Sequence, residues 1–209
     1  MKRSFISIVF LSLLIMLFVS CTQNQSQVDS PDTVVSHFLK ALQQQNYASA
    51  KTYYAENLDN MANFRNQIEE ISPSVANKLF SKMADFSYTV NEVTINPDDP
   101  NKANVAVTIK AYDLGKAFES TVLDYIKTDI TMTFDGATSD DVIKKVEEVI
   151  VKDIESSEQT FVRDVTVSLT KENDTWKLDK ISDNPDLLNV LSGNIIDTIN
   201  QLSASLTSK

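Results

Sequence analysis

Between residues 30 and 45 the apolar positions recur every three or four residues, as they do on one face of a helix. Ser30 suits the N-cap, Pro31 the first turn and Asp32 the positive end of the helix dipole. The apolar face consists of Val34, Val35, Phe38, Ala41 and Leu42. An amphipathic helix is therefore expected here, with this face turned towards the core.

The same spacing predicts further helices before the first strand. A break follows at 46–47, and Ala48 begins a second, short helix. Another helical pattern runs from 58 to 83 and is interrupted at Ser72-Pro73, where proline fits the first turn of a new helix.

Beyond these helices the apolar residues alternate with polar ones, which is typical of strands. The first alternating residues are Phe86, Tyr88 and Val90. After Asn91-Glu92 the parity flips, and a flip of this kind predicts a β-bulge. A turn over 96–101 leads into a second strand over 103–111, whose apolar residues all point to one side.

Residues 113–155 return to helical spacing and are expected to form an inserted pair of helices, separated by Asp135-Gly136. The segment 130–134 also alternates as a strand would, so the pattern leaves the end of the first inserted helix open. The second helix is expected to begin at Ser139.

The last part of the mature chain predicts a hairpin and a helix. Residues 159–170 alternate as a strand, and 176–178 form its partner after a polar turn. A single last helix is expected from Asn184-Pro185, with Gly193 inside it.

The first 20 residues are typical of a cleaved signal peptide. Lys2 and Arg3 precede an apolar run over 5–19, which as a helix would span about 22 Å, less than the ~30 Å hydrocarbon core of a bilayer. The run is therefore too short for a permanent transmembrane helix.

The end of this segment, Leu17-Phe18-Val19-Ser20-Cys21, resembles the lipobox of bacterial lipoproteins. The resemblance implies cleavage between Ser20 and Cys21 and a diacylglyceryl group on Cys21, although Phe18 departs from the usual Leu. Two acyl chains make a stable membrane anchor, and the segment 21–29, with its polar run over 22–27, is expected to act as a tether. The alternative is an idle thiol that ends a non-lipidated signal peptide.

Charge and composition narrow the classes of function. The chain has 209 residues with 19 Lys and Arg against 29 Asp and Glu, a net charge of −10. Removing the first 20 residues leaves 189, with 17 basic against 29 acidic side chains and a balance of −12. Such a surface is repelled by nucleic-acid phosphates and by anionic headgroups, so no nucleic-acid partner is expected and membrane contact runs through the lipid.

The rare residue types exclude several kinds of site. One Cys rules out an internal disulfide, and with a single His no metal site is expected. Three Gly leave no phosphate-binding loop of the G-x-G-x-x-G or P-loop kind, and no cofactor is expected.

The first helices and the last hairpin carry a family resemblance. The residues concerned are Ser30-Pro31-Asp32-Thr33-Val34-Val35, Phe38-Leu39-Lys40-Ala41-Leu42, Asn46-Tyr47-Ala48-Ser49-Ala50, and the strand pair 165–169 with 176–178. They resemble nuclear transport factor 2-like, or cystatin-like, domains. Together with the lipobox, they make the chain similar to lipoproteins of Gram-positive bacteria that carry such a domain. The inserted helices depart from the minimal form of that fold.

The resemblance implies an α+β domain in which N-terminal helices pack on a strongly bent antiparallel sheet, a cone whose mouth can hold a small apolar ligand. The residues expected to line it are Tyr54, Phe86, Tyr88 and Trp176. The same aromatic side chains could instead fill the cone as core, and the helices of 113–155 could plug it.

Enzymes that resemble this fold use an Asp or His base beside a Tyr or Asp that polarises a carbonyl. His37 lies on the flank of the first helix, where a solvated or packing role is expected. The acidic residues over 140–155 lack the calcium-loop pattern and indicate a solvated helix face. No catalytic residue is therefore assigned.

Three segments are expected: a signal peptide (1–20), a lipidated Cys with its tether (21–29) and one α+β domain (30–209). The expected function is that of a lipid-anchored, extracytoplasmic and non-catalytic module that binds a small ligand or another envelope protein. The alternative is a hydrolase or isomerase that uses an acidic and aromatic pocket in the cone.

Overall fold

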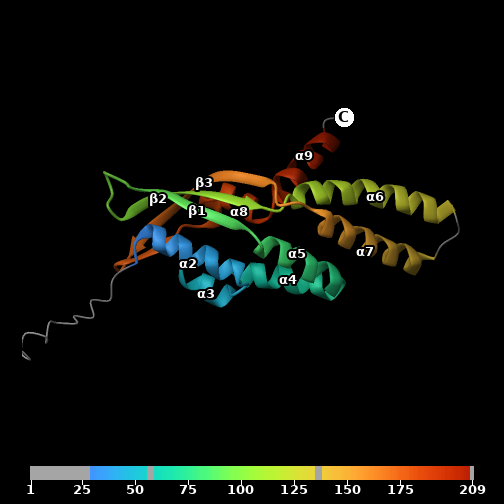
Figure 1. Ribbon diagram of the computed structural model, residues 1–209, viewed down its shortest axis with the longest axis horizontal. Helices are drawn as coiled ribbons and strands as arrows, with labels where there is room; N and C mark the ends of the chain where they lie inside the picture. The colour runs from blue at the N-terminus through green and yellow to red at the C-terminus, as the bar shows by residue number, and fades with distance from the viewer. Residues whose placement is uncertain (1–28, 56–58, 135–137, 208–209) are drawn as a thin grey trace, which may run out of the picture.

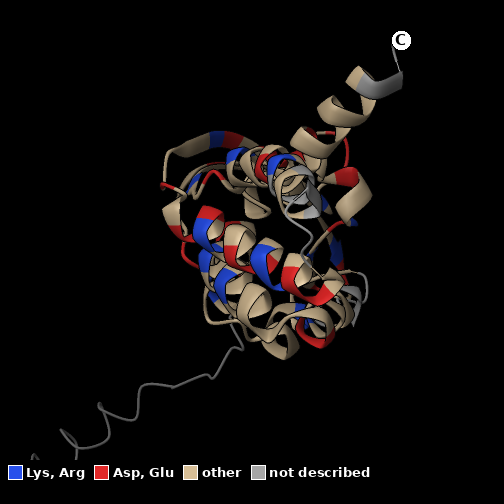
Figure 2. Cartoon of the chain, turned by 90° about the vertical axis from the view of Figure 1, so that its right-hand side faces the viewer, with Lys and Arg blue, Asp and Glu red and all other residues tan. Residues whose placement is uncertain are grey.

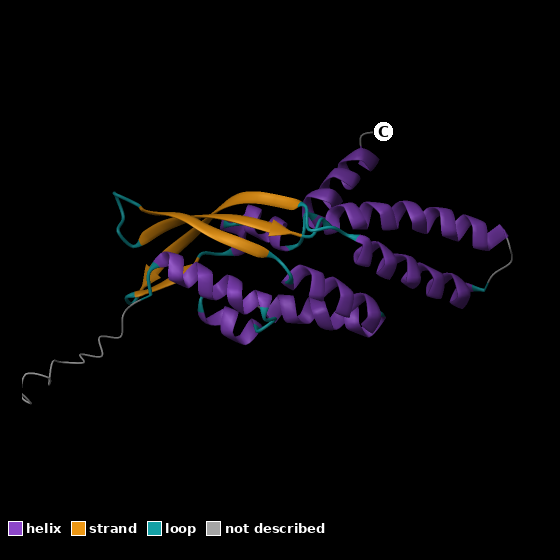
Figure 3. Ribbon diagram, viewed as in Figure 1, coloured by secondary structure: helices purple, strands orange, loops and turns teal. Residues whose placement is uncertain are grey.

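The computed structural model describes residues 29–55, 59–134 and 138–207. Within them, eight α-helices and a four-stranded antiparallel sheet form an α+β fold, which confirms the expected fold class (Figures 1 and 3). In chain order the elements are α2 (Pro31–Gln43), α3 (Tyr47–Thr52), α4 (Asp59–Ile71), α5 (Pro73–Ala84), β1 (Ser87–Ile95), β2 (Lys102–Ala111), α6 (Leu114–Phe134), α7 (Ser139–Ser156), β3 (Phe161–Glu172), β4 (Thr175–Leu178), a 3₁₀ turn η1 (Ile181–Asp183), α8 (Pro185–Leu191) and α9 (Ile195–Thr207).

The sheet buries one face and leaves the other to solvent. Its strand order is β1-β2-β3-β4, and each neighbouring pair is antiparallel. On β2 the buried residues alternate with exposed or half-buried ones, and the buried set is Ala103, Val105, Val107, Ile109 and Ala111. Helix α2 packs against β1, β2 and β4, and α8 packs against β2 and β3, so these two helices cover the apolar face.

The predicted parity flip in the first strand is a β-bulge. Val90 pairs with Val107, but Glu92 pairs with Ala106, so Asn91 is the extra residue of β1. The Asn91 amide donates a hydrogen bond to the Thr108 hydroxyl at 2.9 Å. The bulge increases the local twist of β1 where the strand passes over α2.

The N-terminal helices follow the predicted pattern, with one difference at a cap. Pro31 occupies the first turn of α2, but Ser30 makes no capping bond to the backbone, because its hydroxyl pairs with that of Thr33 at 2.9 Å. At the start of α5, Ser72 does cap, since its hydroxyl accepts from the Val75 amide at 3.1 Å.

The inserted helices α6 and α7 form a hairpin that extends away from the sheet (Figure 1). The alternating segment 130–134 is helical and belongs to α6. Thr138, one residue before the expected start, caps α7. The hairpin meets the rest of the molecule where α7 packs on α5 and α6 packs on α9.

The prediction of a single C-terminal helix is wrong. The chain forms two helices, α8 and α9, with a turn at 192–194. Gly193 adopts a left-handed conformation with φ +63°, and Asn194 follows with φ +71°, so neither can continue a right-handed helix. A Cβ on Gly193 would overlap the carbonyl oxygen of Tyr112, which explains why glycine stands there.

Candidate functional site

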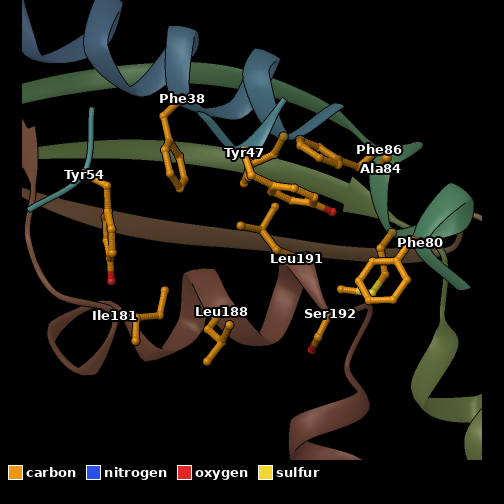
Figure 4. Close-up of a pocket in the computed structure, with 12 residues that line it drawn as sticks. Phe38, Tyr47, Tyr54, Phe80, Ala84, Phe86, Ile181, Leu188, Leu191 and Ser192 are labelled. Carbon is orange, nitrogen blue, oxygen red and sulfur yellow. The ribbon is translucent and has the colours of Figure 1, made fainter. Parts of the chain in front are cut away.

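An apolar cavity lies between the helices that cover the sheet (Figure 4). Its volume is ≈ 60 Å³. Helices α2 and α3 border it on one side, η1 and α8 on the other, and α5 closes one end. Its lining is Phe38, Leu42, Tyr47, Tyr54, Phe80, Met83, Ala84, Phe86, Ile181, Leu188, Leu191 and Ser192.

Helical spacing explains how each helix contributes to this lining. Phe38 and Leu42 are four residues apart on α2, and Leu188 and Leu191 are three apart on α8, so each pair lies on one face. Phe38 also stacks on Tyr54, with ring centroids 6.0 Å apart. The cavity therefore forms where three or more amphipathic elements turn their apolar faces to one another.

The structure brings two of the four predicted lining residues to this cavity. Tyr54 and Phe86 line it, and both are buried. Tyr88 lies beside Phe86, but its hydroxyl donates to the Ser36 carbonyl at 3.1 Å and joins β1 to α2. Trp176 is buried in β4 as part of the core and is not among the lining residues.

Most of the other lining residues lie on helices whose apolar faces the sequence does indicate. Phe80 and Met83 belong to the helical pattern over 58–83, and Leu188 belongs to the helix expected from Asn184-Pro185. The sequence does not show that α5 and α8 border the same cavity, because that arrangement depends on tertiary packing over about a hundred residues. Periodicity predicts an apolar face but not which other face covers it.

Arg65 of α4 lies beside the lining, where it contacts two of its aromatic side chains. Its guanidinium carbon is 5.3 Å from the ring centre of Phe80, a cation–π geometry. Burial raises the pKa of the Tyr47 phenol, and the neighbouring Arg65 guanidinium opposes only part of that rise. Tyr47 is therefore a neutral hydroxyl at pH 7, beside a permanent cation.

The polar partners that hold Arg65 are mainly neutral. One terminal nitrogen donates to the side-chain oxygen of Gln45, and the other lies 3.5 Å from Oδ1 of Asn77. Among the described residues, an oxygen of the Glu69 carboxylate lies 3.9 Å from Nε. The guanidinium is thus oriented by amides, and its charge is only weakly compensated.

Gln45 occupies an unusual backbone position for a residue of its type. It has φ +53°, directly after the end of α2, where its amide donates to the Leu42 carbonyl and that of Asn46 donates to the Ala41 carbonyl. This is the Schellman arrangement, in which glycine is the usual residue. A non-glycine residue costs about 1 kcal/mol there, and the side chain so placed holds Arg65.

The groups that catalysis would need lie outside the cavity. Tyr112 donates to Oδ2 of Asp85 at 3.2 Å, and this bond raises the pKa of the phenol, but the pair is on the surface. His37 is half exposed, 3.5 Å from an oxygen of Asp29 and against the ring of Tyr53. Among the described residues, no cluster of three His, Cys, Asp or Glu side chains could hold a metal ion.

A second, polar cavity of ≈ 250 Å³ lies where the α6–α7 hairpin joins the sheet. Asp153, its buried carboxylate, accepts a hydrogen bond from the Thr121 hydroxyl at 3.0 Å. Asp113 accepts from the Lys116 amide at 3.1 Å, which caps the first turn of α6. These contacts give both acids a structural role.

The lipidation prediction falls on residues that the structure does not describe. Ser20 and Cys21 both lie outside the described residues. In the part of the chain that is described, none of the helices has the length and apolar character needed to cross a bilayer.

No protein-family model matches the chain, and no curated protein matches it. A solved structure that does match is that of YcdA from Bacillus subtilis subsp. subtilis str. 168, described as a putative lipoprotein. The two chains are 12% identical, with a TM-score of 0.44. The match covers 77% of this chain and 57% of YcdA, so the chain spans little more than half of YcdA's length.

Proposed function

We propose that this protein is a lipid-anchored, extracytoplasmic binding protein that takes a small apolar ligand into the cavity between α2, α5 and α8. The observation that carries the proposal is the cavity itself, whose lining is almost wholly aliphatic and aromatic. The anchor is proposed from Cys21, the only Cys of the chain, which Ser20 separates from the end of its long apolar run. The nuclear transport factor 2-like character of the domain belongs to the same proposal.

The size and shape of the cavity favour a small ligand over a protein partner. A protein interface needs an extended surface of about 800 Å² on each side, whereas this site is a recess between helices. At ≈ 60 Å³ it is well below the roughly 300 Å³ of a drug-sized pocket. A ligand's small apolar group, rather than a whole cofactor, fits such a space.

The chemistry of the lining favours binding over catalysis. Among the described residues, the polar groups on the lining are the hydroxyls of two tyrosines and of Ser192. No carboxylate or imidazole lines the cavity there to act as a base. The hydrolase or isomerase alternative needs an acidic group beside a tyrosine, and among the described residues that line this cavity the tyrosines have no acidic neighbour.

The test follows the NMR signal of a methionine methyl group that lines the cavity. The full lipidated chain, with ¹³C-methyl methionine, is placed in nanodiscs of zwitterionic lipid and titrated with 1-butanol. The methyl signal of Met83, assigned with Met83→Leu, should shift saturably because Met83 lines the cavity. The signal of Met132, on α6, should not shift because that residue is on the distant hairpin.

Two variants, one of which fills the cavity with an added ring, provide the control. Ala84→Phe adds a ring to the lining and should weaken butanol binding at least about tenfold, since the ring occupies the space. Ser81→Phe adds the same ring to an exposed position of the same helix and should leave binding unchanged. An unshifted Met83 signal, or equal binding by both variants, would refute the proposal.

A further inference from the structure

We infer that the ligand of this cavity is a small amphiphilic carboxylate, whose apolar group enters the cavity while its carboxylate binds Arg65. This inference rests on the proposed function. It specifies the charge and the chemical class of the ligand, whereas the lining alone would admit any small apolar molecule.

The first argument is a weakly compensated charge beside an apolar recess. Arg65 contacts the lining through Phe80 and Tyr47, yet its close polar partners are the amide side chains of Gln45 and Asn77. Among the described residues, the carboxylate paired with it is that of Glu69, which is at 3.9 Å and is half exposed. Because amides orient a guanidinium without neutralising it, an arriving anion gains most of the Coulomb attraction.

The second argument is geometric. A guanidinium offers parallel N–H donors that match the two oxygens of a carboxylate. The side chain of Arg65 is 26% exposed, so it is accessible from solvent but partly desolvated by Phe80. The Tyr47 hydroxyl, neutral at pH 7, can donate to the same carboxylate.

The third argument is backbone conformation. Gln45 keeps a left-handed conformation in which glycine is usual, and its side chain accepts from Arg65. Local strain of this kind is concentrated at functional sites, where it holds a group in a fixed position. Here the group held is the cation beside the cavity.

The volume limits the apolar group. An apolar cavity of about 150 Å³ holds a benzene ring, so ≈ 60 Å³ accepts a short aliphatic chain or the end of a longer one. Met83, an unbranched and flexible side chain, can adapt to its length. Butanoate is therefore a suitable probe.

The experiment compares three probes of one length on the full lipidated chain in zwitterionic nanodiscs at pH 7: butanoate, 1-butanol and butylammonium. The dissociation constant is read from the Met83 methyl shift. Butanoate should bind about tenfold more tightly than butanol, and butylammonium most weakly, since a hydrogen bond to a charged group adds to the same apolar contact. Added salt should weaken the binding of butanoate only.

Variants test the named residue. Arg65→Met keeps an apolar stem against Phe80 and should lower butanoate affinity about tenfold while leaving butanol affinity within about twofold. Arg163→Met, which removes a guanidinium stacked on Phe161 elsewhere on the sheet, should change neither. The comparison of the three probes uses only the unmodified chain. It therefore still tests the inference if the Arg65→Met protein folds poorly.

The outcomes separate the two claims. If butanol and butanoate bind equally to the unmodified chain, the carboxylate inference is wrong and the proposed binding function stands. If neither probe shifts Met83, the proposed function fails, and the inference fails with it.

Discussion

Two glycines allow the start of α6 to lie against the turn between α8 and α9. The Gly115 amide donates to the Gly193 carbonyl at 2.8 Å. A Cβ on Gly115 would lie 2.6 Å from the carbonyl oxygen of Asn194, and Gly193 is itself left-handed. Gly193→Ala and Gly115→Ala should each lower the free energy of unfolding by about 1–3 kcal/mol, through strain and backbone overlap.

Urea unfolding of the two variants measures this loss. Glu119→Ala, an exposed change one turn along α6 from Gly115, is the matched control and should stay within about 0.5 kcal/mol of the unmodified protein. If the glycine variants were as stable as this control, the close approach would not be needed for the fold.

At this scale the sequence predicts some residues of the candidate site and misses others for clear reasons. Tyr54 and Phe86 are expected as lining because they are aromatic residues placed in the cone that the family resemblance implies, and both line the cavity. Arg65 is one of many charged residues on a helical pattern, and only the folded contacts with Gln45 and Phe80 set it apart. Charge alone does not reveal a partner, because most charged side chains lie on solvated faces.

At the scale of elements, α7 begins with a capping box. The Thr138 hydroxyl accepts from the Asp141 amide at 3.3 Å, and the Asp141 carboxylate accepts from the Thr138 amide at 3.2 Å. The Thr138 hydroxyl also lies 2.6 Å from Oδ2 of Asp141. Its hydrogen bond to the carboxylate, together with that of the Thr138 amide, lowers the pKa of Asp141 below its usual value of 3.8. The carboxylate therefore stabilises α7 above its unfolded pKa, and that contribution is lost as the pH falls through the lower, folded value.

Asp141→Asn should remove this acid-dependent part of the stability of α7. Amide exchange in α7, followed from pH 6 down to pH 3, should show a smaller fall in protection in the variant than in the unmodified protein. Asp140→Asn removes the same charge from the same helical turn without either capping bond, so the pH dependence should remain. Identical profiles for the two variants would assign the effect to the helix dipole rather than to the box.

Element types are predictable from this chain because local patterns fix them. The flip in parity at Asn91 predicted the bulge of β1, and the break at Ser72-Pro73 predicted the start of α5. The division between α8 and α9 was missed because Gly193 can stand inside a helix at modest cost, and only the carbonyl of Tyr112 beside it demands the left-handed turn.

At the scale of the whole molecule, the start of α2 lies at one end of the longest axis, and the end of α6 and the start of α7 lie at the other (Figure 1). The turn between β1 and β2 lies at the same end as the start of α2. Figure 2 views the molecule from the hairpin end, where acidic and basic residues are interspersed along the helices.

This arrangement, with the proposed anchor, predicts an orientation on the membrane. Residues 22–30 reach at most about 30 Å when fully extended, and the 21 residues of α6 alone form a rod of about 32 Å. A lipid on Cys21 therefore keeps the β1–β2 turn near the bilayer and the hairpin far from it. A fluorophore on Asp98→Cys should be quenched by headgroup-bound quenchers several-fold more than one on Lys144→Cys.

The two labelling sites suit the comparison because both are exposed, one in the β1–β2 turn and one near the start of α7. Cys21 itself would be acylated, so each added thiol would be the only one to react. In a chain that lacks residues 1–20 and also carries Cys21→Ala, quenching at both sites should fall to background, since neither a lipid nor the apolar signal segment then holds it to the bilayer and its acidic surface gives no other attraction to lipid. Equal quenching at the two sites in the anchored chain would mean that the domain tumbles on its tether, and stronger quenching at residue 144 would mean that the hairpin faces the bilayer. Either result would contradict the predicted orientation, because an anchor of this length at the start of α2 holds that end of the molecule closest to the lipid.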